Sequence, residues 1–266
     1  MRILIRGAGD LATGIAYRLH KSGFEVIMTE TEIPLTVRRT VAFSRAVYEE
    51  KAQVEDAIAE LINTPGGIDE VLKRGNMPVI VDPKLKYLKE YQADVIVDAI
   101  LAKKNLGTTI HDAEFVIGVG PGFTAGEDCH VVVETQRGHM LGRVIHEGSA
   151  IPNTGIPGVI GGYSIERIIR AVADGLYEPV VQIGDRVEKD EIVAYSGGKP
   201  VFALMGGIVR GMLQSEVCVQ TGMKCGDIDA RCEVEYCYTI SDKARAIGGG
   251  VLEAIMEYFN KHGRKM

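Results

Sequence analysis

The sequence predicts an α/β fold, with a parallel sheet in the N-terminal part, a β-rich region after it and a helix at the C-terminal end. Three observations support this order. Short Val/Ile-rich runs alternate with segments of helix length over about the first 105 residues. Glycine-rich runs without helical periodicity follow, and the last segment is helical. We therefore expect three parts, at residues 1–106, 107–240 and 241–266.

The first part has four apolar runs of strand length and three segments of helix length between or beside them. The runs are 3–5, 25–28, 78–82 and 94–100, and the segments are 11–22, 68–74 and 84–91. Strands that alternate with helices form crossover units. The sheet is therefore expected to be parallel.

The composition is that of an ordinary globular protein. The chain has 266 residues, of which 46% are hydrophobic and 25% charged, and its formal net charge is −6. Nucleic acid is not expected as a partner, because there is no excess of basic residues. The first residues lack the order of a signal peptide, and no apolar run reaches the roughly 20 residues that span a bilayer. These features predict a cytoplasmic protein without membrane contact.

The five cysteines are odd in number and contain no C-x-x-C spacing. Both facts argue against a disulfide framework and a zinc ribbon. We expect reduced thiols, most of them buried.

A glycine-rich turn follows the first predicted strand in "RGAGDLATG". Gly7, Gly9 and Ala12 match the G-x-G-x-x-[G/A] fingerprint of Rossmann-like dinucleotide-binding domains, in the required place between strand and helix. Glu30, at the end of the second strand, has the position of the acid that binds the ribose. Asp10 would have to point away from the phosphates as a helix cap. The alternative is a purely structural turn.

Two further groups are expected at the same nucleotide-binding crevice. Arg38 and Arg39 follow the second strand and present planar guanidinium groups suited to phosphate or carboxylate. A solvated helix face is the alternative for this pair. Gly118, Gly120 and Gly122 in "GVGPGF" could present consecutive backbone N–H groups as an anion nest.

Asp128, Cys129 and His130 are adjacent in the sequence, so in a strand their side chains would alternate between the two faces. No metal site is therefore expected there, because structural zinc prefers better-defined spacings. The role of these three residues is left open by the sequence.

The region after the glycine-rich run predicts a helix from Ser164 to Gly175 and then a small barrel. The turn Gly184-Asp185 and the runs 201–209 and 219–222 resemble the barrel of biotinyl and lipoyl carrier domains, the barrel-sandwich hybrid. Lys199 lies near a hairpin tip but lacks the flanking residues of a modified lysine. Recognition or interaction is therefore the expected role of this module.

The last predicted helix starts after Ser241, a suitable N-cap, and Gly263 would end it. The triple glycine Gly248 to Gly250 costs roughly 1 kcal/mol per residue relative to alanine. Another helix or a ligand is therefore expected to approach the backbone there.

Long motifs along nearly the whole chain carry a family resemblance. They are "RGAGDLATG", "RRTVAFSRAVYE", "VDAILAKKNLGTT", "IGVGPGFTAGEDCHVVVETQRGH", "MKCGDIDAR" and "TISDKARAIGGGVLEAI". Together they resemble the accessory-protein family of the selenium-dependent molybdenum hydroxylase system. Ala230 stands where that family usually has proline. The resemblance implies a maturation role, a molybdenum hydroxylase as partner and a molybdopterin-type cofactor as ligand.

Two functions fit these observations best, and a carrier protein modified at Lys199 is a third possibility. The first is an accessory protein that binds a dinucleotide-like ligand, either the molybdenum cofactor or NAD(P), in the Rossmann crevice. The alternative is an NAD(P)-dependent oxidoreductase acting on an unknown small substrate. Hydride transfer would need an acid or base, and the candidates are His130, His139, His146, Lys103 and Lys104. Whether the chain is an enzyme and whether it forms a homo-oligomer both stay open.

Overall fold

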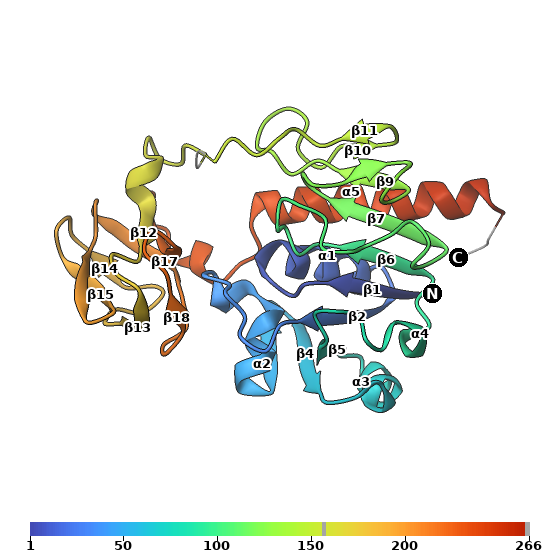
Figure 1. The fold of residues 1–266 in the computed structure, drawn as a ribbon, viewed down its shortest axis with the longest axis horizontal. Coiled ribbons are helices and arrows are strands. Elements are labelled where there is room, and N and C mark those ends of the chain that lie inside the picture. Colours follow the sequence, from blue (N-terminus) through green and yellow to red (C-terminus); the bar gives the residue numbers. More distant parts are fainter. Residues whose placement is uncertain (156–157, 264–266) are drawn as a thin grey trace. The chain divides into compact units, whose positions relative to one another are not determined.

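The computed structural model describes residues 1–155 and 158–263. The chain forms two compact units (Figure 1). The larger unit contains Met1–Pro34, Ala42–Thr154 and Ile240–Met266, and the smaller contains Leu35–Val41 and Gly155–Thr239. Compactness does not show that a segment folds independently, so the predicted domain boundaries after residues 106 and 240 stay predictions. Residues 156–157 of the predicted proline- and glycine-rich loop and 264–266 of the last predicted part lie outside the described residues.

A nine-stranded sheet forms the centre of the larger unit, in the order β10-β9-β7-β6-β1-β2-β5-β4-β3. The strands are β1 (Arg2–Arg6), β2 (Glu25–Glu30), β3 (Lys51–Val54), β4 (Ala57–Ile62), β5 (Met77–Val81), β6 (Val95–Asp98), β7 (Phe115–Val119), β9 (Val131–Val133) and β10 (Val144–Ile145). Neighbours pair in parallel except β3 with β4 and β10 with β9. The separate pair β8 (Thr124–Ala125) and β11 (Gly148–Ser149) is antiparallel.

The fold class predicted from the sequence is wrong in how it divides this unit. A Rossmann-like parallel sheet was expected to end near residue 106, but β7 and β9 from the next region extend the same sheet, and antiparallel strands occupy both of its edges. The β-rich texture of residues 115–145 has a simple cause. Central strands are covered on both faces and are apolar throughout, as all five residues of β7 are buried.

The helices of the larger unit are α1 (Asp10–Lys21), α2 (Ala46–Glu49), α3 (Ile68–Lys73), α4 (Leu88–Tyr91) and α5 (Asp242–Lys261), with 3₁₀ turns η2 (Phe43–Arg45) and η3 (Pro65–Gly67). The predictions of α1, α3 and α5 are confirmed to within a few residues. Ser241 caps α5, since its hydroxyl accepts the N–H of Ala244 at 3.2 Å. None of the described helices is long and apolar enough to cross a membrane.

Glycines let α1 and α5 pack backbone to backbone, side by side (Figure 1). A Cβ on Gly14 would lie 2.6 Å from the Cβ of Ala244, and one on Gly248 would lie 2.9 Å from the carbonyl oxygen of Gly14. Gly250 faces the carbonyl of Gly142 within contact distance. The predicted close approach at the triple glycine is thus confirmed: another helix and a loop of the protein make it.

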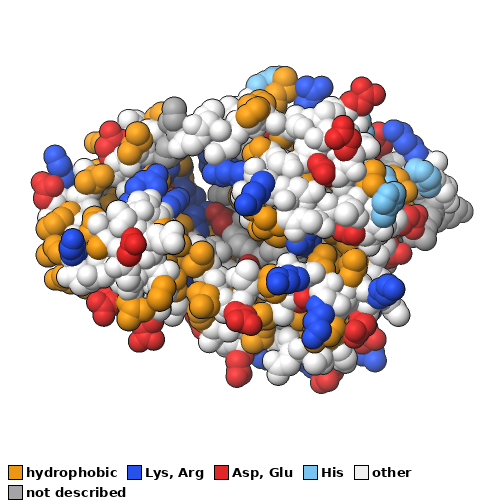
Figure 2. All heavy atoms as spheres, viewed as in Figure 1, with side chains coloured by type: hydrophobic (Ala, Val, Ile, Leu, Met, Phe, Trp, Pro, Cys, Tyr) orange, Lys and Arg blue, Asp and Glu red, His pale blue; other side chains and the backbone are white. Residues whose placement is uncertain are grey.

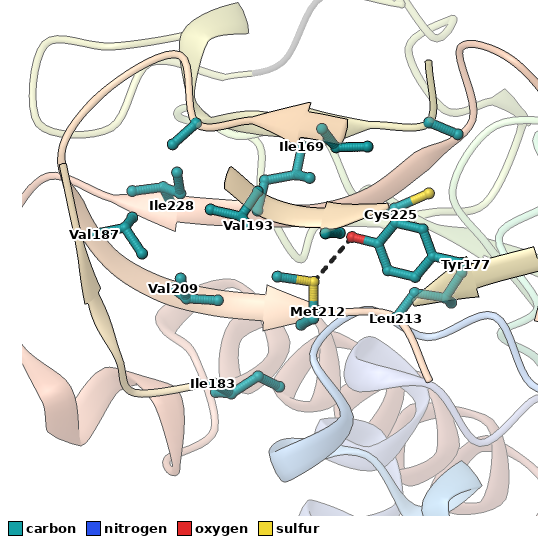
Figure 3. Close-up of a cluster of buried hydrophobic side chains, with 14 of the residues drawn as sticks. Ile169, Tyr177, Ile183, Val187, Val193, Val209, Met212, Leu213, Cys225 and Ile228 are labelled. Carbon is teal, nitrogen blue, oxygen red and sulfur yellow. Dashed lines mark hydrogen bonds between the residues drawn. The ribbon is translucent and has the colours of Figure 1, made fainter. Parts of the chain in front are cut away.

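The smaller unit consists of two four-stranded antiparallel sheets, in the orders β12-β19-β17-β14 and β16-β15-β13-β18. The strands are β12 (Ile168–Arg170), β13 (Gly175–Pro179), β14 (Arg186–Val187), β15 (Ile192–Ser196), β16 (Lys199–Phe202), β17 (Gly207–Met212), β18 (Cys218–Val219) and β19 (Lys224–Asp229), with 3₁₀ turns η1 (Arg39–Val41), η4 (Ile165–Arg167) and η5 (Val234–Cys237). Apolar side chains fill the unit, and the Tyr177 hydroxyl lies 3.0 Å from the sulfur of Met212 (Figure 3).

Two predictions for this unit are wrong. The biotinyl/lipoyl-like barrel is replaced by two separate sheets of hydrogen-bonded strands that do not close on themselves within the described residues. The helix expected from Ser164 to Gly175 is only the turn η4, followed by strand β12. The apolar pair Ile168 and Ile169 packs in the strand, and Gly175 takes a φ of 135° that a helix does not use.

Two neighbouring glycines of α5 give opposite predictions. Gly250→Ala should lower the free energy of unfolding by about 1–3 kcal/mol, because the methyl group overlaps the Gly142 carbonyl. Gly249→Ala should raise it by about 1 kcal/mol, because that position has open space and alanine favours the helix. Urea unfolding of both variants measures the difference. Equal effects would contradict the close helix packing.

Candidate functional site

The carboxyl ends of the parallel strands gather the segments that the sequence singled out. The turn from β1 into α1 follows Arg6, the chain leaves β6 after Asp98, and the glycine-rich loop continues from β7. In open α/β sheets ligands bind outside this edge. The candidate site therefore consists of these loops and the start of α5.

A buried ion pair fixes the ends of β1 and β6. Arg6 and Asp98 lie 3.1 Å apart with side chains almost fully buried, and the Thr108 hydroxyl donates to Asp98 at 2.6 Å. Thr108 also bonds the Arg6 guanidinium. The loop after β6 is thereby tied to the sheet edge.

The fingerprint turn is satisfied by groups of the protein. Gly7 takes a φ of 97°, so a glycine is required there, and its N–H donates to the carbonyl of Thr29. The N–H of Ala8 donates to the Glu30 carboxylate at 3.0 Å. The Ala8 carbonyl accepts from the N–H of Ser44 at 2.8 Å, so η2 covers this turn. Glu30 therefore binds the turn itself, where a ribose was expected.

The first turns of α1 and α5 lie at the same end of the packed helix pair. Gly14 contacts Ala244 and Arg18 contacts Gly248, so contacts advance in the same direction along both helices. The two helices are therefore parallel, and Asp10 and Asp242 start them side by side. Each helix start carries a partial positive charge, so the two reinforce each other.

Lys243, the second residue of α5, is the basic group of this edge. It is half-buried, and its ammonium has no ion-pair partner within 4 Å among residues 1–155 and 158–263. Burial lowers the pKa of Lys243, and the positive charge of Arg137 lowers it further, while Asp10 and Glu134 act in the opposite direction. A desolvated amine without a bonded counter-charge is a candidate ligand-binding group.

Glu134 organises the loop beside Lys243. Its carboxylate is buried and accepts backbone N–H bonds from Thr135 and Gln136, both at 2.7 Å, and from Ile151 at 2.8 Å. The next basic group, Arg137, makes a bidentate pair with Asp242 at 2.7 and 3.0 Å. The loop after β9 is thus fastened to the start of α5.

The glycines of the "GVGPGF" loop lie against protein atoms. A Cβ on Gly118 would lie 2.5 Å from the ring of Phe123, and one on Gly120 would lie 2.7 Å from the Thr135 hydroxyl. A Cβ on Gly122 would lie 2.6 Å from the backbone nitrogen of Lys104. Close internal packing is therefore one reason for these glycines, and the anion nest stays a prediction.

The other predicted ligand residues are distributed as follows. Gly9 is the N-cap of α1 in an extended conformation, and Ala12 is buried in its first turn. Arg38 and Arg39 belong to the smaller unit, where they bond the carbonyls of Tyr236 and Met212. Their binding roles stay predictions.

The histidine candidates do not gather near Lys243. His130 accepts the N–H of Val116 through Nδ1 at 3.0 Å, and its ring lies edge-on to that of Tyr258 towards the far end of α5. Burial lowers the pKa of His130. His146 pairs with Glu257 at 3.3 Å in the same part of the helix. His139, Lys103 and Lys104 are exposed.

Asp128, Cys129 and His130 have separate structural contacts. Asp128 accepts the N–H of Thr124 at 2.8 Å and a bond from Asn105 at 3.1 Å. Burial raises the pKa of the Cys129 thiol to about 11. All five cysteines are free thiols, and three of them are buried. Among the described residues, no three His, Cys, Asp or Glu side chains are placed to hold a metal ion.

Sequence reasoning missed Lys243 and Glu134. In the sequence, Lys243 resembles an ordinary solvated lysine at the start of a helix. Its burial depends on segments that are distant in the chain, so no local pattern predicts it. A signal was present for Glu134: a lone carboxylate ends the apolar run "VVVE" at a strand terminus, where backbone N–H groups are free.

The comparisons with known proteins give no family. No family model matches the chain. It is 48% identical over 254 residues to "Uncharacterized protein YqeB" of Escherichia coli (strain K12), which covers 96% of this chain. The chain spans about half, 47%, of the length of that curated relative.

Solved structures with low similarity include an aspartoacylase family protein of Mesorhizobium loti, with 10% identity, a TM-score of 0.26 and coverage of 85% of this chain and 84% of that one. A succinylglutamate desuccinylase of a Silicibacter species has 11% identity and a TM-score of 0.25, with the same coverage. The ectoine utilization protein EutE of Ruegeria pomeroyi has 12% identity and a TM-score of 0.26, again with that coverage. TM-scores this low carry no argument about fold or activity.

These findings overturn the resemblance to the selenium-dependent molybdenum hydroxylase system. No family model supports it, and the curated relative that the chain matches is an uncharacterised protein. The maturation role, the hydroxylase partner, the dinucleotide-like ligand, the molybdopterin-type or NAD(P) cofactor and the oxidoreductase alternative are withdrawn with it. The hydrogen bond from the Ala8 N–H to Glu30 gives a physical reason against the dinucleotide ligand. It engages both a backbone amide of the turn and the acid that was expected to bind the ribose.

Removing the Glu134 carboxylate should destabilise the larger unit. In Glu134→Ala, the N–H groups of Thr135, Gln136 and Ile151 lose their acceptor in a buried place, which should lower the free energy of unfolding by about 2–3 kcal/mol. Chemical denaturation measures the loss. Glu147→Ala is the control, since that side chain is exposed and should change stability by less than about 0.5 kcal/mol. A similar effect of both variants would contradict the role of Glu134.

Proposed function

We propose that the protein binds a small molecule through a phosphate or carboxylate group at the carboxyl edge of the large sheet. The observation that supports this most is the half-buried Lys243 ammonium, without an ion-pair partner among the described residues, beside the first turns of two parallel helices. An anion there would supply the missing counter-charge. It would also face the positive ends of α1 and α5.

The neighbouring groups favour one localised anionic group. Arg137 is already paired with Asp242, and the Glu134 carboxylate is occupied by three N–H bonds. Lys243 is thus a cation whose charge is available for a ligand, and the exposed Lys103 lies close enough to lower the pKa of Lys243. The carboxylate of Asp10 at the start of α1 would repel a second anionic group placed close by. A single phosphate or carboxylate is therefore the proposed recognition element.

The proposed location is the cytoplasm. The five free thiols support it, because secreted chains of this cysteine content usually form disulfides.

Replacing Lys243 tests the proposal. Thermal unfolding of the unsubstituted protein is followed in chloride buffer with added phosphate or succinate at constant ionic strength. Either anion should raise the midpoint, since a ligand of the folded state stabilises it in proportion to RT ln(1 + [L]/Kd). In Lys243→Met the apparent affinity for the effective anion, derived from the shift of the midpoint, should fall at least tenfold.

Lys261→Met is the matched control. Lys261 lies in the last turn of the same helix and pairs with Glu257 at 2.6 Å, so its loss should leave the anion-dependent shift unchanged. The proposal fails if Lys243→Met and the unsubstituted protein respond equally to both anions.

The pH dependence of binding should follow the lowered pKa of Lys243. The ammonium binds the anion, so affinity is highest below that pKa and falls as the pH rises through it, before the value of about 10.4 of an ordinary lysine is reached. In Lys243→Arg the guanidinium stays charged, so the affinity should stay flat over the same range. Titration calorimetry between neutral and alkaline pH compares the two profiles.

The ligand-free protein should show the opposite trend at this residue. Between the lowered folded pKa and the ordinary unfolded pKa, the unfolded chain binds more protons, so the contribution of Lys243 to stability rises with pH. Identical pH profiles of Lys243→Arg and the unsubstituted protein would contradict the assignment of Lys243.

A further inference from the structure

A second basic cluster lies in the smaller unit, on the sheet β12-β19-β17-β14. Figure 2 shows Lys and Arg side chains gathered on this unit. Its buried members are Arg167 from η4, Arg210 from β17, and Asp227 and Asp229 from β19, each at most 6% exposed. The partly exposed Lys224 and Arg231 complete it and form its solvent-facing side.

The strand pairing brings the two buried arginines over one face of β19. Arg167 immediately precedes Ile168, which pairs with Asp227, and Arg210 lies in a bulge of β17 opposite Asp227 and Ile228. Asp227 and Asp229 are two residues apart and share a face. Strands that flank a common neighbour lie roughly 10 Å apart, a gap that two arginine side chains can close from both sides.

The carboxylates of the cluster do not satisfy both buried arginines. Asp229 accepts three bonds from Arg231, namely from its backbone N–H at 3.0 Å, Nε at 2.9 Å and Nη2 at 2.6 Å. Nη1 of Arg210 lies 3.7 Å from the same carboxylate, beyond hydrogen-bond distance, and its Nε donates to the carbonyl of Tyr236 at 3.3 Å. Arg231 thus makes all the hydrogen bonds that these two arginines give to Asp229, while Arg210 acts on it through charge alone.

Arg167 also lies beyond hydrogen-bond distance of its nearest carboxylate. Its Nη1 lies 3.6 Å from Asp227, and neither its Nε nor its Nη1 has a hydrogen-bond partner among the described residues. Lys224 lies 4.0 Å from the same Asp227 carboxylate. Burying an arginine without a hydrogen-bonded counter-charge is costly, and here the Asp227 carboxylate, whose Oδ1 also has no hydrogen-bond partner among the described residues, stays 3.6 Å away.

The basic side chains of the cluster outnumber its two carboxylates, and all of them belong to the smaller unit. Burial and the positive charge of Arg38 lower the pKa of Arg210, while Asp227 and Asp229 act in the opposite direction. Planar guanidinium groups bind the paired oxygens of phosphate and carboxylate groups in bidentate geometry. The chemistry of the cluster therefore matches an oxyanion.

We propose that Arg167 and Arg210 form a second oxyanion-binding site in the smaller unit, which takes a phosphate or carboxylate group of a small ligand. The site is independent of the one around Lys243, because every residue named for it belongs to the smaller unit. A purely internal charge network is the competing explanation. In such a network the carboxylates would lie at hydrogen-bond distance from the buried arginines, whereas the shortest ion-pair distances are 3.6 Å for Arg167 with Asp227 and 3.7 Å for Arg210 with Asp229.

The test counts anion sites by titration calorimetry with inorganic phosphate and, in a second arm, succinate. The unsubstituted protein should bind two equivalents of the effective anion, and the two arms distinguish a phosphate from a carboxylate site. Arg167→Met should lose one equivalent and keep the one that depends on Lys243. Lys243→Met should lose the other. Arg186→Met is the control, since Arg186 is exposed in the same unit and should leave both equivalents.

Crystals of the unsubstituted protein soaked in selenate give a readout that does not depend on a variant folding. An anomalous peak within hydrogen-bond distance of Arg167 and Arg210 supports the site. The proposal is overturned if Arg167→Met folds and binds as many equivalents as the unsubstituted protein, or if the soaked crystals show no peak at the two arginines. If the only anomalous peak lies at Lys243, or if only Lys243→Met loses an equivalent of anion, the proposed function is supported and this second site is refuted.

Discussion

The contact between the backbones of α1 and α5 determines the geometry of the larger unit. Side chains at Gly14, Gly248 and Gly250 would prevent the two helices and the Gly142 loop from approaching as they do. Because the approach is parallel, both helix starts come to the same edge of the sheet. Lys243 is desolvated at that edge for the same reason, so the electrostatics of the site follow from the absence of side chains elsewhere.

The two ends of α5 have different chemistry. At its start lie charged groups: Lys243, the Asp242 carboxylate that pairs with Arg137, and the nearby Asp10 and Glu134. Towards its end, the ring of Tyr258 stacks on Phe115 at 4.2 Å and its hydroxyl bonds the carbonyl of Glu114 at 3.1 Å. This apolar anchor joins the helix to the beginning of β7. The helix is thus fixed at one end by aromatic packing, while the other end presents polar groups at the sheet edge.

Much of the fold was predictable where a local pattern determines it. Apolar runs located β1, β2, β5 and β6, and Ser241 marked the start of α5. The hairpin of β3 and β4 was missed because Glu55 and Asp56 form its turn, with a φ of 53° at Glu55, where glycine or asparagine would have been the signal. The false helix after Ser164 came from a good capping residue followed by too short an apolar run. Of the candidate site, the sequence located the loops but not Lys243, because its burial depends on contacts with distant segments.

The larger unit is discontinuous in the chain, and this has a consequence for biosynthesis. Gly14 and Ala244 touch although about 230 positions separate them, so a non-local contact completes the unit. On the ribosome, strands β1 to β10 emerge before α5, and the main segment of the smaller unit, Gly155–Thr239, is translated in between. The sheet face that α5 covers therefore stays exposed to water during this interval. A nascent chain in that state is a natural client for a chaperone, and a chain released before α5 is made would aggregate through that face.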